Sequence, residues 1–191
     1  MKVCILMGSP NREGNTAAVV APFVDQLEEL GCVCERIYLE NMVIKPCISC
    51  RSCQENWSDF ACVQEDDMEE IFDEIMTSEV IILASPIYSW YCTPPMKAAL
   101  DRLVYAMNKY FGAQRGPALW AGKKLGIITT CGYPVETGAD LWEEGMKRYC
   151  RHSQLEYLGM LAERHLGYQV EFMDEEKRNR ARKFAKNIAN R

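Results

Sequence analysis

The chain has 191 residues, 48% of them hydrophobic and 26% charged, and its formal net charge is −5 at pH 7. This size and apolar content exclude a disordered chain and predict a single domain over residues 1–191 with a large buried core. The acidic balance argues against a nucleic-acid-binding protein, which normally presents a basic face.

Two further classes are disfavoured by the distribution of apolar residues. The first apolar run, residues 3–7, is shorter than the roughly 7–15 residues of a secretion signal, and no stretch approaches the ~20 residues of a membrane span. We therefore expect a cytoplasmic protein with no membrane segment. Ten cysteines in such a chain indicate metal, cluster or redox chemistry rather than disulfides.

Strand and helix patterns alternate along the chain. Short apolar runs predict buried strands at residues 2–7, 32–39, 80–86, 124–132 and 155–163. Helical spacing of apolar residues predicts helices at 16–30, 66–79, 95–107, 139–152 and at the C-terminus. This order predicts an α/β fold, a doubly wound five-stranded parallel sheet with helices on both faces.

Two long stretches lack a clear pattern, residues 108–123 and a cysteine-rich insertion at about 40–65 after the second strand. In a doubly wound sheet the ligand binds at the carboxyl ends of the strands. The loops after the first, third and fourth strands are therefore the places where we expect a binding site.

The first of these loops, GSPNREGNT at residues 8–16, has neither the G-x-G-x-x-G spacing of dinucleotide-binding proteins nor a Walker A lysine. It does have the donors of a phosphate cradle that opens a helix: Ser9, Arg12, Asn15 and Thr16. An ordinary strand-to-helix turn, with Asn15 and Thr16 as caps, is the alternative.

The pattern G-S-P-x-x-x-G-N-T after the first strand resembles the flavodoxin-like FMN reductase family. The resemblance implies that this loop holds the FMN phosphate. The stretch SPIYSWYCTPPMKAALDR at 85–102 is similar to the same family and implies a loop that lines the flavin ring, formed by Pro86, Ile87, Tyr88, Ser89 and Trp90.

The loop after the fourth strand, TTCGYPVETG, is a third candidate for ring contact, through Cys131, Gly132 and Tyr133. A flat heteroaromatic ring needs an apolar slot and nearby backbone donors, which such loops supply. Lys97 and the pair Asp101–Arg102 are interpreted as solvated or local ion pairing on their helix.

The insertion carries four cysteines in a C-x2-C-x2-C-x8-C spacing: Cys47, Cys50, Cys53 and Cys62. Iron–sulfur flavoproteins, which the chain resembles, carry a four-cysteine run here that holds a [4Fe–4S] cluster. The gap of eight residues is longer than that subgroup leads us to expect. Structural zinc and reduced thiols without metal are the alternatives.

The resemblance implies an FMN-dependent oxidoreductase that passes electrons from NAD(P)H to a quinone, azo compound, flavin or similar acceptor. The main alternative is an electron carrier that relays electrons between protein partners through FMN and the cluster. A module with an unfilled flavin site is a third. The family also implies a homodimer or homotetramer, with contacts expected from Trp90, Tyr91 and the aromatic residues Tyr105, Tyr110, Phe111 and Trp120.

Overall fold

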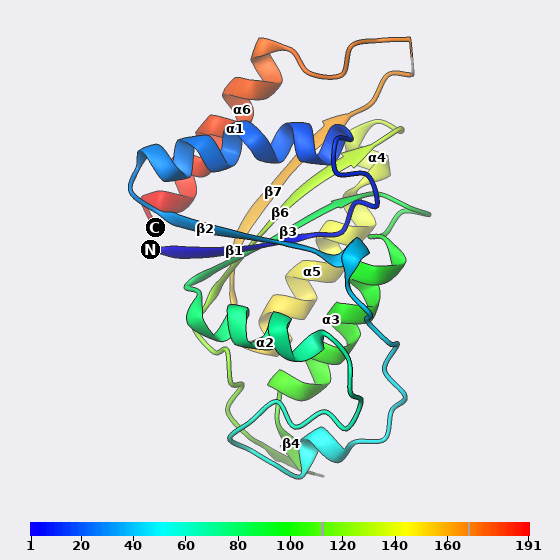
Figure 1. Ribbon diagram of the computed structural model, residues 1–191, viewed down its shortest axis with the longest axis vertical. Helices are drawn as coiled ribbons and strands as arrows, with labels where there is room; N and C mark the ends of the chain where they lie inside the picture. The colour runs from blue at the N-terminus through cyan, green and yellow to red at the C-terminus, as the bar shows by residue number, and fades with distance from the viewer. Residues whose placement is uncertain (112, 168) are drawn as a thin grey trace.

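The structure is a computed structural model that describes residues 1–111, 113–167 and 169–191, with only the backbone of residue 111 (Figure 1). Its main sheet has five parallel strands: β1 (Lys2–Met7), β2 (Val33–Tyr38), β3 (Val80–Pro86), β6 (Lys124–Cys131) and β7 (Glu156–Arg164). The strand order is β2-β1-β3-β6-β7, the flavodoxin-like order of a doubly wound sheet. The predicted fold class is confirmed.

The long helices cover both faces of this sheet. They are α1 (Asn15–Glu29), α2 (Met68–Thr77), α3 (Pro94–Met107), α5 (Asp140–Ser153) and α6 (Glu175–Ala189). Figure 1 shows α1 and α6 on one face and α2, α3 and α5 on the other. The predicted helices and strands match these elements to within about two residues.

Alternation along the strands explains the two layers. In β1, Val3 and Ile5 belong to the apolar cluster under α1 and α6, whereas Cys4 and Leu6 belong to the cluster under the other helices. All four are fully buried. A continuous apolar run is therefore what a strand covered on both faces requires.

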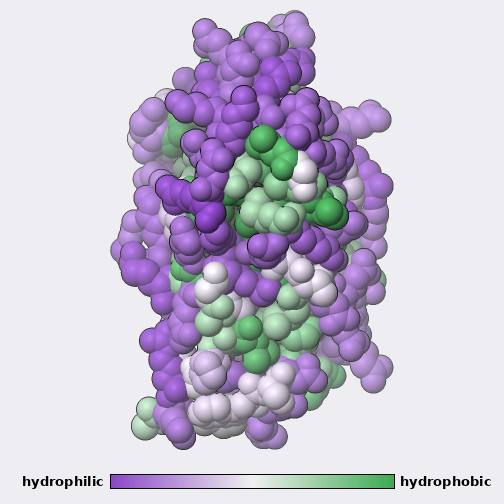
Figure 2. All heavy atoms as spheres, turned by 90° about the vertical axis from the view of Figure 1, so that its left-hand side faces the viewer, coloured by the Kyte–Doolittle hydropathy of each residue, from purple (hydrophilic) through white to green (hydrophobic). Residues whose placement is uncertain are grey.

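The strand ends place three loops at one edge. Met7 of β1 lies opposite Ala84 of β3, and Pro86 of β3 lies opposite Thr130 of β6. The loops after these strands consequently meet at the carboxyl edge, as expected. The two chain ends lie at the opposite edge (Figure 1). The face on that side is mostly hydrophilic, with its apolar residues gathered in separate patches (Figure 2).

The two patternless stretches contain short elements that the sequence did not predict. The insertion has two 3₁₀ turns, η1 (Leu39–Asn41) and η2 (Ser52–Gln54), while residues 108–123 contain a ribbon of β4 (Tyr110–Phe111) and β5 (Gln114–Arg115). A short helix, α4 (Val135–Gly138), follows β6. Among the described residues, no helix is both long and apolar enough to cross a membrane.

The prediction that Trp120 supplies a subunit contact is wrong. This side chain is only 1% exposed, and its Nε1 donates to Asn108 Oδ1 at 2.9 Å within the core. Tyr105, Tyr110 and Trp90 are exposed. The side chain of Phe111 lies outside the described part of the chain.

Candidate functional site

The loop between β1 and α1 presents an uncapped helix N-terminus. Gly14 is the N-cap residue of α1, and no side chain among the described residues caps this end. The first turn contains no acidic residue. The free N–H groups and the positive end of the helix dipole favour an anion here. Ser9 is 6% exposed and its hydroxyl bonds the backbone of Asn11, which fixes the loop before the helix.

The two ends of this loop differ in what their side chains contact. Arg12 does not turn to the helix N-terminus; its guanidinium pairs with Glu40 and lies 4.4 Å above the Tyr38 ring. Thr16 is buried, and its hydroxyl lies 2.9 Å from that of Thr130 at the end of β6. Asn15 begins α1.

Buried hydroxyls tie the three loops together. Thr93, the N-cap residue of α3, donates to the carbonyl of Gly8 at 2.6 Å, and its N–H donates to Ser85 Oγ at 3.1 Å. The N–H of Ile87 donates to the carbonyl of Thr130 at 2.8 Å. A Cβ at Gly8 would lie 3.0 Å from Thr93 Oγ1, so glycine permits this close approach.

The loop after β3 forms a tight turn that exposes aromatic rings. The N–H groups of Tyr88 and Tyr91 donate to each other's carbonyls at 2.8 and 3.0 Å. Between them, Ser89 and Trp90 have φ values of 49° and 63°, a left-handed conformation that is costly for residues other than glycine. Such strain is frequent at ligand sites.

The loop after β6 faces this turn. The rings of Tyr133 and Trp90 stack with their centroids 5.7 Å apart and their planes 14° apart. Both are exposed, which leaves a flat aromatic surface at the carboxyl edge. Gly132 is exposed and accepts from Arg164 Nε at 3.3 Å. Cys131 is buried, and this burial raises the pKa of its thiol, which disfavours the thiolate form.

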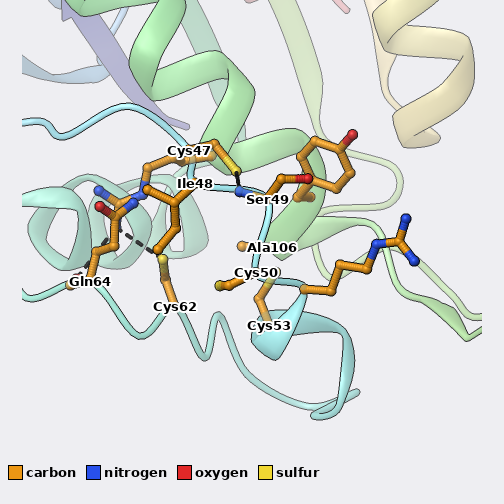
Figure 3. Close-up of a pocket in the computed structure, with 11 residues that line it drawn as sticks. Cys47, Ile48, Ser49, Cys50, Cys53, Cys62, Gln64 and Ala106 are labelled. Carbon is orange, nitrogen blue, oxygen red and sulfur yellow. Dashed lines mark hydrogen bonds between the residues drawn. The ribbon is translucent and has the colours of Figure 1, made fainter.

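The insertion brings the four predicted cysteines to one place. They line a single small pocket of about 20 Å³ beside α3, together with Ser49, Arg102 and Tyr105. Figure 3 shows the labelled cysteines around this space. Across residues 1–111, 113–167 and 169–191, no three Cys, His, Asp or Glu side chains are assembled closely enough to hold a metal ion as they stand.

Hydrogen-bond donors surround the sulfurs. The N–H of Ser49 donates to Cys47 Sγ at 3.4 Å (Figure 3). Hydrogen bonds from the backbone N–H of Ser52 and, to a smaller extent, from its hydroxyl lower the pKa of Cys50. Burial raises the pKa of Cys53. These donors stabilise negative charge on sulfur, which a thiolate ligand carries.

The backbone of the insertion is strained near these sulfurs. Ser49, Arg51 and Ala61 all have φ between 51° and 66°. Of the six described residues other than glycine with positive φ, five lie in the insertion or in the Tyr88–Tyr91 turn. Strain is thus concentrated at the two places that the sequence indicated for cofactors.

The interpretation of the α3 charges is half right. Lys97 Nζ lies 2.6 Å from Asp101 Oδ1 in a half-exposed pair, as predicted. Arg102, by contrast, is only 2% exposed and reaches the insertion instead of solvent. Lys109 is fully buried and its ammonium donates to the carbonyls of Cys53 at 2.9 Å and Asp59 at 2.6 Å.

Sequence reasoning therefore missed Thr93, Thr130, Arg102 and Lys109. The position of Thr93 immediately before two prolines is a helix N-cap signal, and Thr130 stands at a strand end. Nothing in the sequence marks Arg102 and Lys109 as buried, since both residue types are normally exposed.

With this geometry in view, comparisons with known proteins identify related chains. A family model described as NADPH-dependent FMN reductase matches residues 1–139. An iron–sulfur flavoprotein of Methanosarcina thermophila is 31% identical over 124 residues, which is 64% of this chain and 63% of that protein. Another, from Methanocaldococcus jannaschii, is 35% identical over 102 residues, 53% of this chain and 51% of that protein.

Solved structures show the same fold. The NAD(P)H:quinone oxidoreductase of Methanothermobacter marburgensis superposes with a TM-score of 0.70 at 22% identity, covering 98% of each chain. An FMN-dependent NADH-azoreductase of Bacillus anthracis, in complex with FMN, has a TM-score of 0.71 at 16% identity, covering 99% of this chain and 97% of that one.

The sequence matches span 46–63% of the length of the first three curated relatives.

Proposed function

The chain belongs to the NADPH-dependent FMN reductase family, whose members are FMN-binding oxidoreductases. We propose that it transfers electrons from NAD(P)H to FMN and that its insertion holds a [4Fe–4S] cluster. The observation that carries the cluster is the convergence of Cys47, Cys50, Cys53 and Cys62 on one pocket. Similarity to iron–sulfur flavoproteins supports it.

The carboxyl edge suits FMN. The uncapped α1 N-terminus, with Ser9, Asn15 and Thr16 beside it, would hold the phosphate. The Tyr88–Tyr91 turn and the loop at Gly132 would bind the ring between aromatic surface and backbone N–H groups. Bound FMN supplies a hydride acceptor and one-electron chemistry. Arg12 would have to leave Glu40 to reach the phosphate.

The pocket suits a cluster by its donor set. Four thiolates are the usual ligands of [4Fe–4S], which supplies one-electron transfer. The N–H donors at Cys47 and Cys50, together with Arg102 at Cys62, would stabilise the charge of the ligating sulfurs. The four cysteines that line this small pocket are the residues that would hold the cluster.

In this arrangement the acceptor is a redox protein or another one-electron acceptor. A second candidate function is direct reduction of a quinone, azo compound or flavin, with the cysteines remaining metal-free thiols. The exposed Trp90–Tyr133 stack favours it, because a flat acceptor can bind such a surface.

Purification without oxygen, followed by quantification of FMN and iron per chain, tests the proposal. We expect about one FMN and four iron. Cys62→Ser should lose iron and keep FMN, while Cys150→Ser, which alters a buried cysteine of α5, should keep both. One FMN with no iron in the wild type supports the second candidate, and NAD(P)H oxidation with a quinone then tests it. The absence of FMN would refute both.

We further propose that the chain forms a homodimer or homotetramer. Exposed aromatic side chains at Trp90, Tyr105 and Tyr110 support this. Light scattering at micromolar concentration checks it, and a monomer there would contradict it.

A further inference from the structure

Arg102 is a charged side chain held inside the protein next to the cysteine pocket. It lies on α3 and its side chain is 1% exposed. Its ion-pair partner, Asp66, has a fully buried side chain and comes from the end of the insertion. A buried guanidinium is costly unless all its donors are used.

The donors of Arg102 are used in an ordered way. Nη1 pairs with Asp66 and donates to the carbonyl of Lys45 at 3.3 Å. Nη2 donates to Cys62 Sγ at 3.1 Å, the bond drawn as a dashed line to that sulfur in Figure 3, and to the carbonyl of Gln64 at 3.5 Å. The planar fork thus lies between a carboxylate and a sulfur.

One donor of the guanidinium remains unused. Nε of Arg102 is buried and has no hydrogen-bond partner in the part of the chain that the structure describes. Arg102 lines the same pocket as the four cysteines. A buried cationic N–H without an acceptor leaves unused donor capacity on a guanidinium that already donates to a sulfur of this pocket.

We propose that Arg102 is a positioning residue for the cluster. It holds Cys62 and sets the cluster's reduction potential through a charge-assisted N–H···S bond, and the negative charge of Asp66 partly opposes this effect. This inference rests on the proposed function. A cation that donates to a ligating sulfur stabilises the more negative, reduced cluster and therefore raises its potential. The carboxylate of Asp66 partly offsets this effect because it pairs with Nη1 of the guanidinium whose Nη2 donates to Cys62.

The purely structural alternative is that Arg102 only fastens the insertion to α3. The two roles predict different directions for the shifts in reduction potential that two substitutions cause. If Arg102 acts electrostatically, weakening its bond to sulfur and removing the charge of Asp66 must move the potential in opposite directions. If it only fastens the loop, both changes loosen the same contact and move the potential the same way or not at all.

The test is a redox titration of the wild type, Arg102→Lys and Asp66→Asn, each purified without oxygen and followed by the EPR signal of the reduced cluster. Lysine keeps the charge but cannot serve a carboxylate and a sulfur in one plane. We expect its reduction equilibrium to fall about tenfold, which is about −59 mV for one electron. Asp66→Asn should shift the potential upward.

Lys97→Gln is the control, because it removes a positive charge from the same helix at a half-exposed side chain that pairs with Asp101. The equilibrium constant for reduction of its cluster should stay within about twofold of the wild-type value. Shifts of Arg102→Lys and Asp66→Asn in the same direction, or no shift in either, overturn the inference.

A second measurement uses the wild-type side chain itself. In protein labelled with ¹⁵N-arginine, pulsed EPR of the reduced cluster should detect ¹⁵N coupling that Arg102→Lys abolishes and that Arg51→Lys, a change at the other pocket-lining arginine, retains. A cluster without this coupling refutes the inference and leaves the proposed function standing. Wild-type protein that binds no iron refutes the cluster part of the proposed function instead.

Discussion

The carboxyl edge of the sheet and the cysteine insertion are both candidate cofactor sites, but they are held in place by different means. The loops of the edge leave parallel strands whose register fixes where each loop begins. The insertion has little secondary structure and is held by polar side chains of α3 and the segment after it, chiefly Arg102 and Lys109. The starting points of the edge loops are therefore set by the strand register, and buried hydroxyls then tie these loops together. The insertion lacks such a framework, so its geometry depends on a few side chains.

This difference predicts that single polar substitutions disturb the insertion far more than the edge. Asp66→Asn should have the largest effect. It leaves the buried guanidinium of Arg102 without its counter-charge, which costs about 3–5 kcal/mol in the free energy of unfolding at pH 7. Urea denaturation measures the loss. Asp101→Asn, in an exposed pair, should cost no more than about 1 kcal/mol.

The effect of Asp66 should depend on pH. Burial by itself raises the pKa of this carboxyl, but hydrogen bonds from Arg102 and from the N–H groups of Lys45 and Met68 outweigh it and hold the pKa below its usual value. A lowered folded-state pKa stabilises the protein above the unfolded pKa of about 4. The difference between wild type and Asp66→Asn should consequently shrink as the pH falls below 4, and a constant difference would contradict the assignment.

Lys109→Met should come second and should loosen the insertion selectively. The substitution removes both donors from the carbonyls of Cys53 and Asp59, at about 1–3 kcal/mol for each group left buried and unpaired. Limited proteolysis should then cut between residues 47 and 62, and FMN affinity should be unchanged.

Lys123→Met provides the control. Its ammonium also donates to two carbonyls, of Met76 at 2.9 Å and Ser78 at 2.5 Å, but at the other end of the sheet. This variant should be destabilised without new cleavage in the insertion. Equal cleavage in both variants would show that the insertion is not separately anchored.

The same contrast explains what the sequence could predict. Periodic apolar residues dictate strands and helices, and strand order then places the loops, so the edge with Ser9, Tyr88 and Gly132 could be located from sequence. The four cysteines were recognised by their spacing together with the resemblance to iron–sulfur flavoproteins. Whether each of these residues contacts a cofactor stays a prediction, and Arg12 pairs with Glu40 in the structure.

The anchors of the insertion could not be predicted from sequence. Arg102 lies 36 residues from Asp66 and 40 from Cys62, and no periodic pattern links them. A charged residue beside Asp101 on an amphipathic helix is normally solvated, so burial of Arg102 depends on the tertiary path of the insertion. The prediction for Trp120 was wrong in the same direction, since this residue was expected at the surface and is buried in the core.

Thr16→Val should have a third, smaller effect, this time at the edge. The change keeps the shape of the side chain but removes a hydroxyl that bonds Thr130 and that we assign to the FMN phosphate. We expect the Kd for FMN to rise about tenfold, because a hydrogen bond to a charged group contributes about 1.5 kcal/mol. Fluorescence titration measures this. Iron content should not change, and Thr77→Val at the end of α2 should leave the Kd unaltered.

The smallest expected effect concerns the Trp90–Tyr133 stack, and it tests whether the aromatic rings of the edge interact when FMN is bound. The two rings come from different loops and are stacked at 5.7 Å with an angle of 14°. Aromatic pairs of this kind couple by about 0.5–1.5 kcal/mol. If FMN inserts its ring between the two loops, it breaks this stack. The interaction free energy between Trp90 and Tyr133, obtained from the two single Leu variants and the double variant, should then be present only in the protein without FMN. A double-mutant cycle on thermal unfolding, with and without FMN, measures it. Coupling that survives FMN binding would mean that the ring binds beside the stack, leaving the aromatic surface free for the acceptor.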